Sequence, residues 1–232
     1  MVCCIEFEMR IFFGVLMRVV VLKDNFSAGR LVFGVDEAGR GPIVGPMVIA
    51  CVGFLPLDVV DLINIGVADS KSISRSTRER LFPRIISLAS AVVVSYVDPR
   101  AIDEWVLNGR NLNRLEAWVI SKILEKIPRG NIFKIFIDAP SGLDKFVSYL
   151  KEFNVFGIVA EHKADVFRPV VSAASIVAKV LRDREIDKIK EEIGVDFGSG
   201  YLTDPKTRKF INYLMENYPN VIRKSWRIGG KA

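Results

Sequence analysis

Acidic residues close several short apolar segments of this 232-residue chain, and they constrain its fold more than any other feature. One apolar segment ends in Asp36 and Glu37, and a second ends in Asp138. Asp165 comes shortly after a third such segment, residues 156–160. A carboxylate at the end of a buried strand is costly unless a cation or hydrogen bonds compensate its charge. The pattern predicts strands whose acidic ends meet, although any single acid can also simply cap a turn or a helix.

The order of the predicted elements indicates a mixed α/β fold. Five segments have the length and apolar or β-branched content of strands: residues 31–36, 46–54, 91–97, 133–138 and 156–160. Helical spacing or capping residues mark residues 74–89, 112–127, 143–152, 170–192 and 204–217. Strands come first, strands and helices then alternate, and helices come last. We therefore expect a mixed five-stranded sheet flanked by helices, with a helical C-terminal part.

Composition sets broad limits on the kind of protein. Half of the residues are apolar and 26% are charged, as in an ordinary globular domain. The net charge of +6 is compatible with a polyanionic partner but does not establish one. Cys3, Cys4 and Cys51 are odd in number and form no CxxC pair. We expect a reduced, cytoplasmic protein without a cysteine-based metal site.

The first thirty residues need a separate interpretation. Residues 11–22 are apolar, but Arg18 interrupts them and the run is shorter than a bilayer span. Acids precede the run, where a signal peptide would carry basic residues. Two interpretations fit better than secretion. The segment is either an extra strand or upstream sequence from a misplaced start, with Met9 or Met17 as the true start. No other apolar run approaches membrane length, so no membrane association is expected.

A glycine-rich loop directly follows the first pair of acids. Gly39, Gly41 and Gly45 punctuate the run GVDEAGRGPIVGPMVIA, residues 34–50, and allow the backbone to approach a ligand closely. Arg40 lies inside this loop, where a guanidinium can hold a phosphate through two hydrogen bonds. Four acids at one sheet edge would form an all-oxygen site for hard divalent cations. Two Mg²⁺ ions in such a site can promote displacement at a phosphodiester.

These segments together resemble the ribonuclease HII family. DEAGRGP at residues 36–42 resembles the family signature, and four further segments follow in the expected order. They are ADSKSIS (68–74), NIFKIFIDA (131–139), EHKADVFRPVVSAASIVAKVLRDREI (161–186) and GSGYLTDPKT (198–207). The resemblance covers roughly residues 31–225. It implies a ribonuclease-H-like catalytic domain over residues 31–195 and a helical substrate-binding region over 196–232, with residues 1–30 as an extension.

The resemblance also implies which acids bind metal. The metal-binding and catalytic carboxylates would be Asp36, Glu37, Asp138 and Asp165, holding two Mg²⁺ or Mn²⁺ ions. Asp183 is the rival for the fourth position. Because Asp183 lies between Arg182 and Arg184 in a charged helix, we favour an ion pair for it. His162 is the only histidine, and we expect it to have a structural or orienting role because metal ions can generate hydroxide without a histidine base.

Substrate contacts are implied in the same way. Gly39, Arg40, Gly41 and Tyr201 would recognise the 2′-hydroxyl that distinguishes RNA from DNA. Lys71, Lys163, Ser175 and Lys179 resemble family positions near the duplex, with surface solubility as the alternative for the lysines. Ser175 and Lys179 are four residues apart and share one helical face. A late basic cluster could extend the contact with the duplex: Lys206, Arg208, Lys209, Arg223 and Lys224. Trp105, Trp118 and Trp226 are expected to pack in the core or between domains.

The implied activity is hydrolysis of the RNA strand of RNA–DNA hybrids and cleavage 5′ of ribonucleotides embedded in duplex DNA, by two-metal-ion catalysis, leaving 3′-hydroxyl and 5′-phosphate ends. One alternative is a related nuclease or recombinase that cuts DNA without needing a 2′-hydroxyl, against which the glycine loop and Tyr201 argue. The other is a non-catalytic binding protein, which would have little reason to retain four acids that repel the nucleic-acid backbone.

The ending RIGGKA lacks a glutamine-led aromatic motif, so docking on the sliding clamp is not expected. A monomer is expected.

Overall fold

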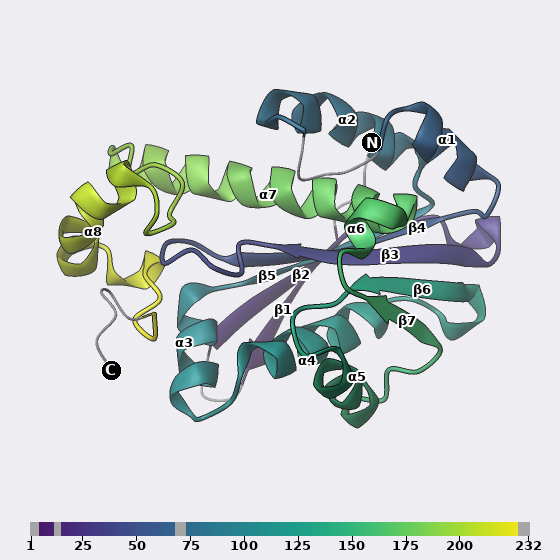
Figure 1. The fold of residues 1–232 in the computed structure, drawn as a ribbon, viewed down its shortest axis with the longest axis horizontal. Helices are drawn as coiled ribbons and strands as arrows, with labels where there is room; N and C mark the ends of the chain where they lie inside the picture. Colours follow the sequence, from purple (N-terminus) through teal and green to yellow (C-terminus); the bar gives the residue numbers. More distant parts are fainter. Residues whose placement is uncertain (1–4, 12–14, 68–72, 227–232) are drawn as a thin grey trace.

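A mixed sheet with helices on both faces forms the centre of the molecule (Figure 1). The computed structural model describes residues 5–11, 15–67 and 73–226. Among these residues the sheet has seven strands in the order β1-β2-β5-β4-β3-β6-β7. The strands are β1 (Ile5–Ile11), β2 (Val15–Asp24), β3 (Leu31–Ala38), β4 (Met47–Phe54), β5 (Ala91–Val97), β6 (Ile132–Asp138) and β7 (Ile158–Glu161). The expected mixed α/β fold is confirmed, and each of the five expected strands is present.

The N-terminal segment adds two strands, so the expected count of five was too low. β1 and β2 form an antiparallel hairpin, and β2 pairs antiparallel with β5. The interpretation of this segment as additional strand structure is confirmed for β2, whose Met17 and Val19 are fully buried. Arg18, which interrupts the apolar run, lies on the opposite face of the strand with its guanidinium 4.8 Å from the centre of the Tyr96 ring.

The pairing of β3, β6 and β7 brings the acidic strand ends together. β3 is antiparallel to β4 but parallel to β6, and β6 is parallel to β7. Parallel strands end at the same edge of a sheet, so the C-terminal ends of these three strands are neighbours. Asp36 near the end of β3 and Asp138 at the end of β6 therefore lie at one edge of the sheet.

Two helical layers bury the two faces of the sheet. On one face lie α1 (Asp58–Asn64), α2 (Arg75–Leu88), α6 (Ala164–Phe167) and α7 (Pro169–Ile193), and on the other lie α3 (Pro99–Leu107), α4 (Leu112–Leu124) and α5 (Leu143–Glu152) (Figure 1). The short helices α1, α3 and α6 were not expected from the sequence. Every residue of β4 and β5 is buried, as expected for central strands covered on both faces.

The chain after α7 forms a small separate cluster at one end of the sheet. α8 (Pro205–Asn217) begins as expected, with Asp204 accepting a 2.9 Å hydrogen bond from the backbone N–H of Lys206. Phe197 and Leu214 of this region pack with Ile43 and Val44 of the glycine loop. The fold thus places the C-terminal region directly against that loop. None of the helices in the described residues is both long and apolar enough to cross a membrane.

Candidate metal centre and substrate loop

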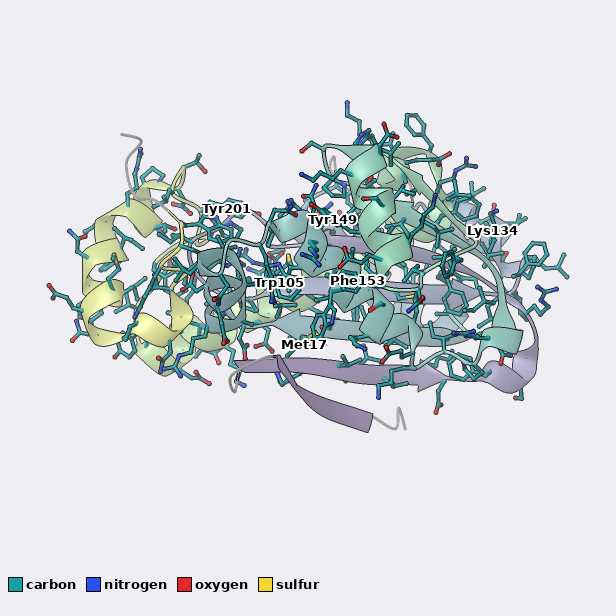
Figure 2. All side chains as sticks on the ribbon, turned by 90° about the horizontal axis from the view of Figure 1, so that it is seen from below. Met17, Trp105, Lys134, Tyr149, Phe153 and Tyr201 are labelled. Carbon is teal, nitrogen blue, oxygen red and sulfur yellow. The ribbon has the colours of Figure 1, made fainter. Side chains whose placement is uncertain are left out.

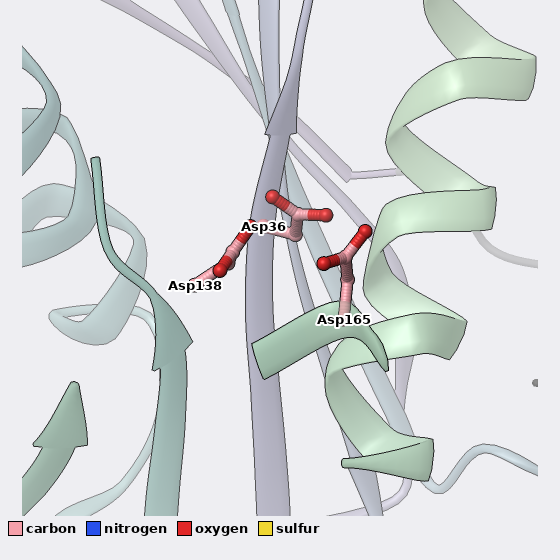
Figure 3. A group of neighbouring side chains, drawn as sticks. All are labelled: Asp36, Asp138 and Asp165. Carbon is pink, nitrogen blue, oxygen red and sulfur yellow. The ribbon is translucent and has the colours of Figure 1, made fainter. Parts of the chain in front are cut away.

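Three aspartates converge at the edge of the sheet (Figure 3). Asp36 comes from β3, Asp138 from the end of β6 and Asp165 from α6. One carboxylate oxygen of each lies within 4.8 Å of the others. Asp36 is only 5% exposed and Asp165 is fully buried. The structure therefore brings together three of the four acids predicted for the site.

Local backbone geometry fixes the position of this cluster. Asp138 accepts a 2.8 Å hydrogen bond from the backbone N–H of Ala164, which ties the end of β6 to the start of α6. The Nδ1 atom of His162 lies 2.9 Å from the carbonyl oxygen of Ala139. Lys163 has a left-handed backbone conformation with a φ of 58° where α6 begins, and the buried Asp165 lies in the first turn of that helix. The histidine thus connects β7 to the end of β6, in keeping with the expected structural role.

Glu37 lies outside the three-aspartate group. Successive residues of a strand point to opposite faces, so Glu37 faces α4 while Asp36 faces α7. A cavity of about 10 Å³ is lined by Asp36, Glu37 and Asp138 together with Glu116 of α4. Glu116 is 2% exposed, and sequence reasoning missed it because it lies inside an ordinary amphipathic helix. Five carboxylates therefore surround this end of the sheet.

Burial and mutual repulsion raise the pKa values of three of these acids. Burial raises the pKa of Asp36 well above its usual range, and the charge of Glu37 raises it further. Burial, followed by the charge of Glu116, raises the pKa of Glu37 to about 8. Burial also raises the pKa of Glu116 to about 7, although Arg40 lowers it. A bound cation would remove this penalty by favouring the ionised forms.

The donor set fits a hard divalent cation. All of the converging side chains are carboxylates, which suit Mg²⁺ and Mn²⁺ and are poor ligands for soft metals. One oxygen of Glu116, Oε2, is buried and accepts no hydrogen bond from the described residues. Repelling acids and an unsatisfied buried oxygen are unfavourable unless a positive charge is bound nearby.

The positions implied for duplex contact fall into different environments. Ser175 is fully buried and hydrogen-bonds to Asp36, while Lys179 donates to Ser175 Oγ at 2.9 Å. The two residues share one face of α7 as predicted, but that face is turned towards the aspartates. Lys163 is exposed beside Asp165. Lys71 lies outside the described residues.

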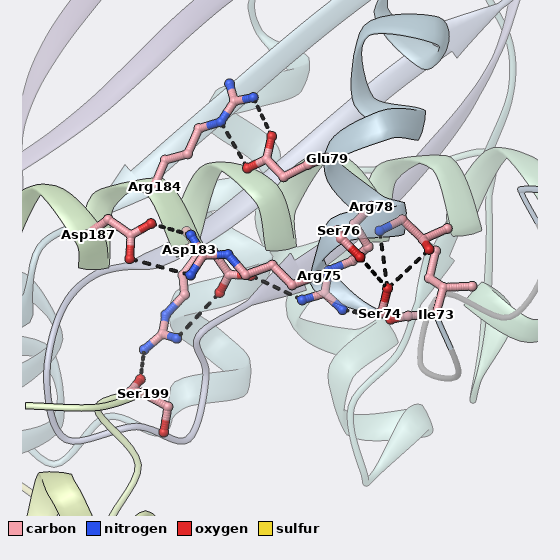
Figure 4. Close-up of polar contacts among 12 residues, drawn as sticks. Ile73, Ser74, Arg75, Ser76, Arg78, Glu79, Asp183, Arg184, Asp187 and Ser199 are labelled. Atoms are coloured by element: carbon pink, nitrogen blue, oxygen red, sulfur yellow. Dashed lines mark hydrogen bonds and ion pairs between the residues drawn. The ribbon is translucent and has the colours of Figure 1, made fainter.

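Asp183 is part of an ion-pair network that joins α2 to α7 (Figure 4). Its carboxylate accepts a 3.1 Å hydrogen bond from Arg78 and lies 4.0 Å from Arg75. Arg184 and Glu79 form a second link at 2.7 Å. Asp183 is absent from the group of three aspartates, so the structure supports its expected role as an ion-pair partner.

The glycine loop and Tyr201 lie in contact. Gly39 has a φ of +80°, which favours glycine, and a Cβ there would lie 2.7 Å from the carbonyl oxygen of Pro46. Gly41 is exposed, and a Cβ atom on it would lie 3.5 Å from Cε1 of Tyr201. Tyr201 is 38% exposed, and Figure 2 shows it where the C-terminal region meets the rest of the molecule. The guanidinium of Arg182 lies 5.5 Å from the centre of the tyrosine ring.

Arg40 does not project freely from the loop. Its guanidinium forms an ion pair with Glu116 and donates a second hydrogen bond to Asn113, both on α4. Asn113 in turn donates a 2.9 Å hydrogen bond to the carbonyl oxygen of Ser141. Arg40 is therefore held by α4, the helix that also presents Glu116 to the acids.

The prediction that Arg223 belongs to a basic cluster along the duplex is wrong. Arg223 is fully buried, so it cannot contact a phosphate from the surface as expected. Its guanidinium donates instead to the backbone carbonyls of Gly39, Arg40 and Gly45. The glycine loop turns these oxygens inward, and a buried guanidinium satisfies them. No sequence signal distinguished this arginine from its exposed neighbour Lys224.

The three tryptophans pack as expected. Trp105 of α3 is buried in the core on the face of the sheet that α3, α4 and α5 cover (Figure 2). Trp118 lies against it with ring centres 6.0 Å apart. Trp226 donates from Nε1 to the carbonyl oxygen of Gly41 at 3.1 Å, so it also contacts the glycine loop.

Comparison with known proteins identifies the family. The family model described as Ribonuclease HII matches residues 33–228. The chain belongs to the ribonuclease HII family. It is 42% identical to the ribonuclease HII of Methanococcus maripaludis (strain C7) over 213 residues, which cover 88% of this chain and 87% of that protein. Members of this family are nucleases that hydrolyse RNA, as the sequence predicted.

Solved structures agree with this assignment. The ribonuclease H2 of Pyrococcus horikoshii OT3 superposes with a TM-score of 0.75 at 39% identity, covering 85% of this chain and 94% of that one. The ribonuclease HII of Archaeoglobus fulgidus, solved as a complex with PCNA, gives a TM-score of 0.76 at 35% identity, with 87% and 98% covered. The fold therefore matches that of the solved ribonuclease HII and ribonuclease H2 structures.

Proposed function

We propose that the chain is an endoribonuclease that cuts the RNA strand of RNA–DNA hybrids and cuts 5′ of single ribonucleotides in duplex DNA. The observation that carries this proposal is the position of the three-aspartate cluster beside a loop that contacts Tyr201. The cluster supplies a cation site, and the loop and the tyrosine supply an exposed surface for a sugar. Family membership supports the activity, while the contacts described above support the substrate.

The proposed metal centre consists of Asp36, Glu37, Asp138 and Asp165. Two Mg²⁺ or Mn²⁺ ions bound there would supply a nucleophile at neutral pH and stabilise charge on the leaving oxygen, giving 3′-hydroxyl and 5′-phosphate products. The residues of the chain orient these acids. Ser175 hydrogen-bonds to Asp36, and the backbone N–H of Ala164 holds Asp138.

Recognition of the ribonucleotide is proposed for Gly39, Arg40, Gly41 and Tyr201. The 2′-hydroxyl both donates and accepts hydrogen bonds, and it alone distinguishes RNA from DNA at a given position. Gly41 is exposed, so its N–H can approach a sugar without interference from a side chain. The neighbouring ring of Tyr201 can stack against the next sugar. Lys163 is exposed beside the aspartates and is proposed to contact phosphate, as are Lys179 and Lys71.

The test is cleavage of a labelled DNA duplex that contains one ribonucleotide, in Mg²⁺, beside an all-DNA duplex of the same sequence. A single cut 5′ of the ribonucleotide that is abolished by a chelator, with no cut in the control, is the expected result. Cleavage of both duplexes would instead favour a DNA nuclease with the same fold. Binding without cleavage in either Mg²⁺ or Mn²⁺ would favour a non-catalytic protein and contradict the proposal.

Two partner expectations remain predictions. The PCNA complex is a property of the Archaeoglobus fulgidus protein. For this chain we expect no direct docking on a sliding clamp, and residues 227–232 lie outside the described residues. A monomer in the cytoplasm likewise remains the expected state.

A further inference from the structure

Arg40 is a cationic group beside the acids on the α4 side, as Lys179 is beside Asp36 on the α7 side. Its guanidinium pairs with Oε1 of Glu116, and Glu116 lines the same small cavity as Asp36, Glu37 and Asp138. The side chain of Arg40 is 30% exposed, whereas that of Glu116 is 2% exposed. The positive charge therefore lies at the boundary between solvent and the buried carboxylates.

α4 holds this charge with two groups on one helical face. Asn113 and Glu116 are three residues apart, so they are neighbours on that face. Glu116 accepts a hydrogen bond from Nη1 of Arg40, and Asn113 accepts one from Nη2. A planar guanidinium that is hydrogen-bonded through both terminal nitrogens is held more rigidly than one held by a single ion pair. The position of Arg40 is thus determined by the helix as well as by its own loop.

The second carboxylate oxygen of Glu116, Oε2, gives a reason for the positive charge of Arg40 at this position. Glu116 Oε2 is buried without a hydrogen-bond donor among the described residues. A buried carboxylate with one unsatisfied oxygen is stabilised mainly by nearby positive charge. Arg40 supplies such a charge, since its guanidinium pairs with the other oxygen of Glu116.

We propose that Arg40 is the resident counter-cation of the metal centre and that Glu116 is the positioning residue that holds it there. Divalent cations entering the centre then experience repulsion from a fixed positive charge. Binding of the ions and retention of Arg40 on Glu116 oppose each other. This inference rests on the metal centre of the proposed function, but it assigns Arg40 a role towards the cations in addition to any role towards phosphate.

The test is a calorimetric titration of substrate-free protein with Mn²⁺, and separately with Mg²⁺. Removing the charge with Arg40→Gln is expected to strengthen cation binding on the order of tenfold, because a unit charge within several ångströms of a partly buried ion has an effect of this size. Arg114→Gln is the matched control, since Arg114 forms an ion pair with Glu152 away from the acids. The control should bind cations like the wild type. Unchanged or weaker binding in Arg40→Gln would overturn the proposal.

A double-mutant cycle tests the role of Glu116. If Glu116 holds Arg40 in place, the strengthening caused by Arg40→Gln should shrink several-fold in a Glu116→Gln background. An equal effect of Arg40→Gln in both backgrounds would show that Glu116 does not position the guanidinium. If Glu116→Gln fails to fold, Asn113→Ala replaces it in the same cycle. This variant removes the second side-chain acceptor of the Arg40 guanidinium.

This outcome is separable from that of the proposed function. Wild-type protein that binds cations and cleaves the ribonucleotide duplex, with Arg40→Gln unchanged in cation affinity, would refute only the counter-cation role. Wild-type protein that binds no divalent cation and does not cleave would refute the proposed function itself.

Discussion

The Nη2 atom of Arg223 lies 2.6 Å from the carbonyl oxygen of Gly39, although 184 positions separate the two residues in the chain. The same guanidinium also donates to the carbonyls of Arg40 and Gly45. Beside it, Asp103 of α3 accepts hydrogen bonds from the backbone N–H groups of Lys224 and Ser225. Hydrogen bonds therefore join the glycine loop and the C-terminal region into a single unit.

Replacing Arg223 should destabilise the protein and disorder this loop. Arg223→Met would remove the guanidinium donor from three loop carbonyls, two of them buried, and each unsatisfied buried group costs about 1–3 kcal/mol. We expect a loss of roughly 3 kcal/mol or more in the free energy of unfolding, together with weaker cleavage. Chemical denaturation measures the first effect. Lys224→Met is the control because Lys224 is the exposed neighbour, and equal stability of the two variants would contradict the buried role of Arg223.

Asp138→Asn should keep the fold and lose activity by orders of magnitude. The amide can still accept the hydrogen bond from the Ala164 N–H, so the local backbone is preserved. It cannot supply the negative charge that a divalent cation needs. Cleavage of the ribonucleotide-containing duplex in Mg²⁺ measures the loss, with Asp61→Asn in the exposed part of α1 as control. Wild-type rates in Asp138→Asn would show that the site is assigned to the wrong residues.

Sequence patterns predicted the acids better than their arrangement. The strand ends identified Asp36 and Asp138, and parallel pairing explains why the two meet. Period-two alternation, however, sends Glu37 to the α4 side, where it lines a cavity with Asp36 and Asp138 but lies outside the group of three aspartates. The expected domain boundaries at residues 30 and 195 stay a prediction.

Local sequence patterns could not predict the long-range contacts of the site. Glu116 and Arg223 approach the loop only because α4 and the C-terminal region fold against it, and their local sequences resemble ordinary helix and surface segments. The sequence does not decide between strand structure and a misplaced start for residues 1–30, for a related reason. The apolar run of this segment fits a strand, but only pairing with β5 shows that it extends the sheet.

The stability of the metal-free protein should fall as the pH rises from about 5 to about 8.5. The pKa of Glu37 is raised to about 8 and that of Glu116 to about 7, so the folded state holds protons that the unfolded chain has already released. The stabilisation is complete below the ordinary glutamate pKa and is lost as the pH passes through the raised values.

Melting temperatures in EDTA at pH 5.5 and pH 8.5 test this prediction. Mg²⁺ should raise the melting temperature more at the higher pH, because the ionised acids bind it there. Glu116→Gln should reduce the pH dependence. A metal-free protein that becomes more stable between these two values would show that the pKa shifts have the opposite sign.

Gly34→Ala should disturb the site without touching an acid. Helix α7 packs so closely on β3 that a Cβ atom at Gly34 would lie 2.0 Å from the carbonyl oxygen of Val170. The helix would have to move outward, and α6 with its Asp165 is joined directly to the start of α7. Overpacking of this kind typically costs about 1–3 kcal/mol.

We expect this variant to show a lower free energy of unfolding and also weaker Mn²⁺ binding, measured by denaturation and by calorimetry. Gly130→Ala is the matched control, since nothing lies within 4 Å of a Cβ atom there. A Gly34→Ala protein that unfolds more easily but binds Mn²⁺ normally would mean that Asp165 keeps its place independently of α7.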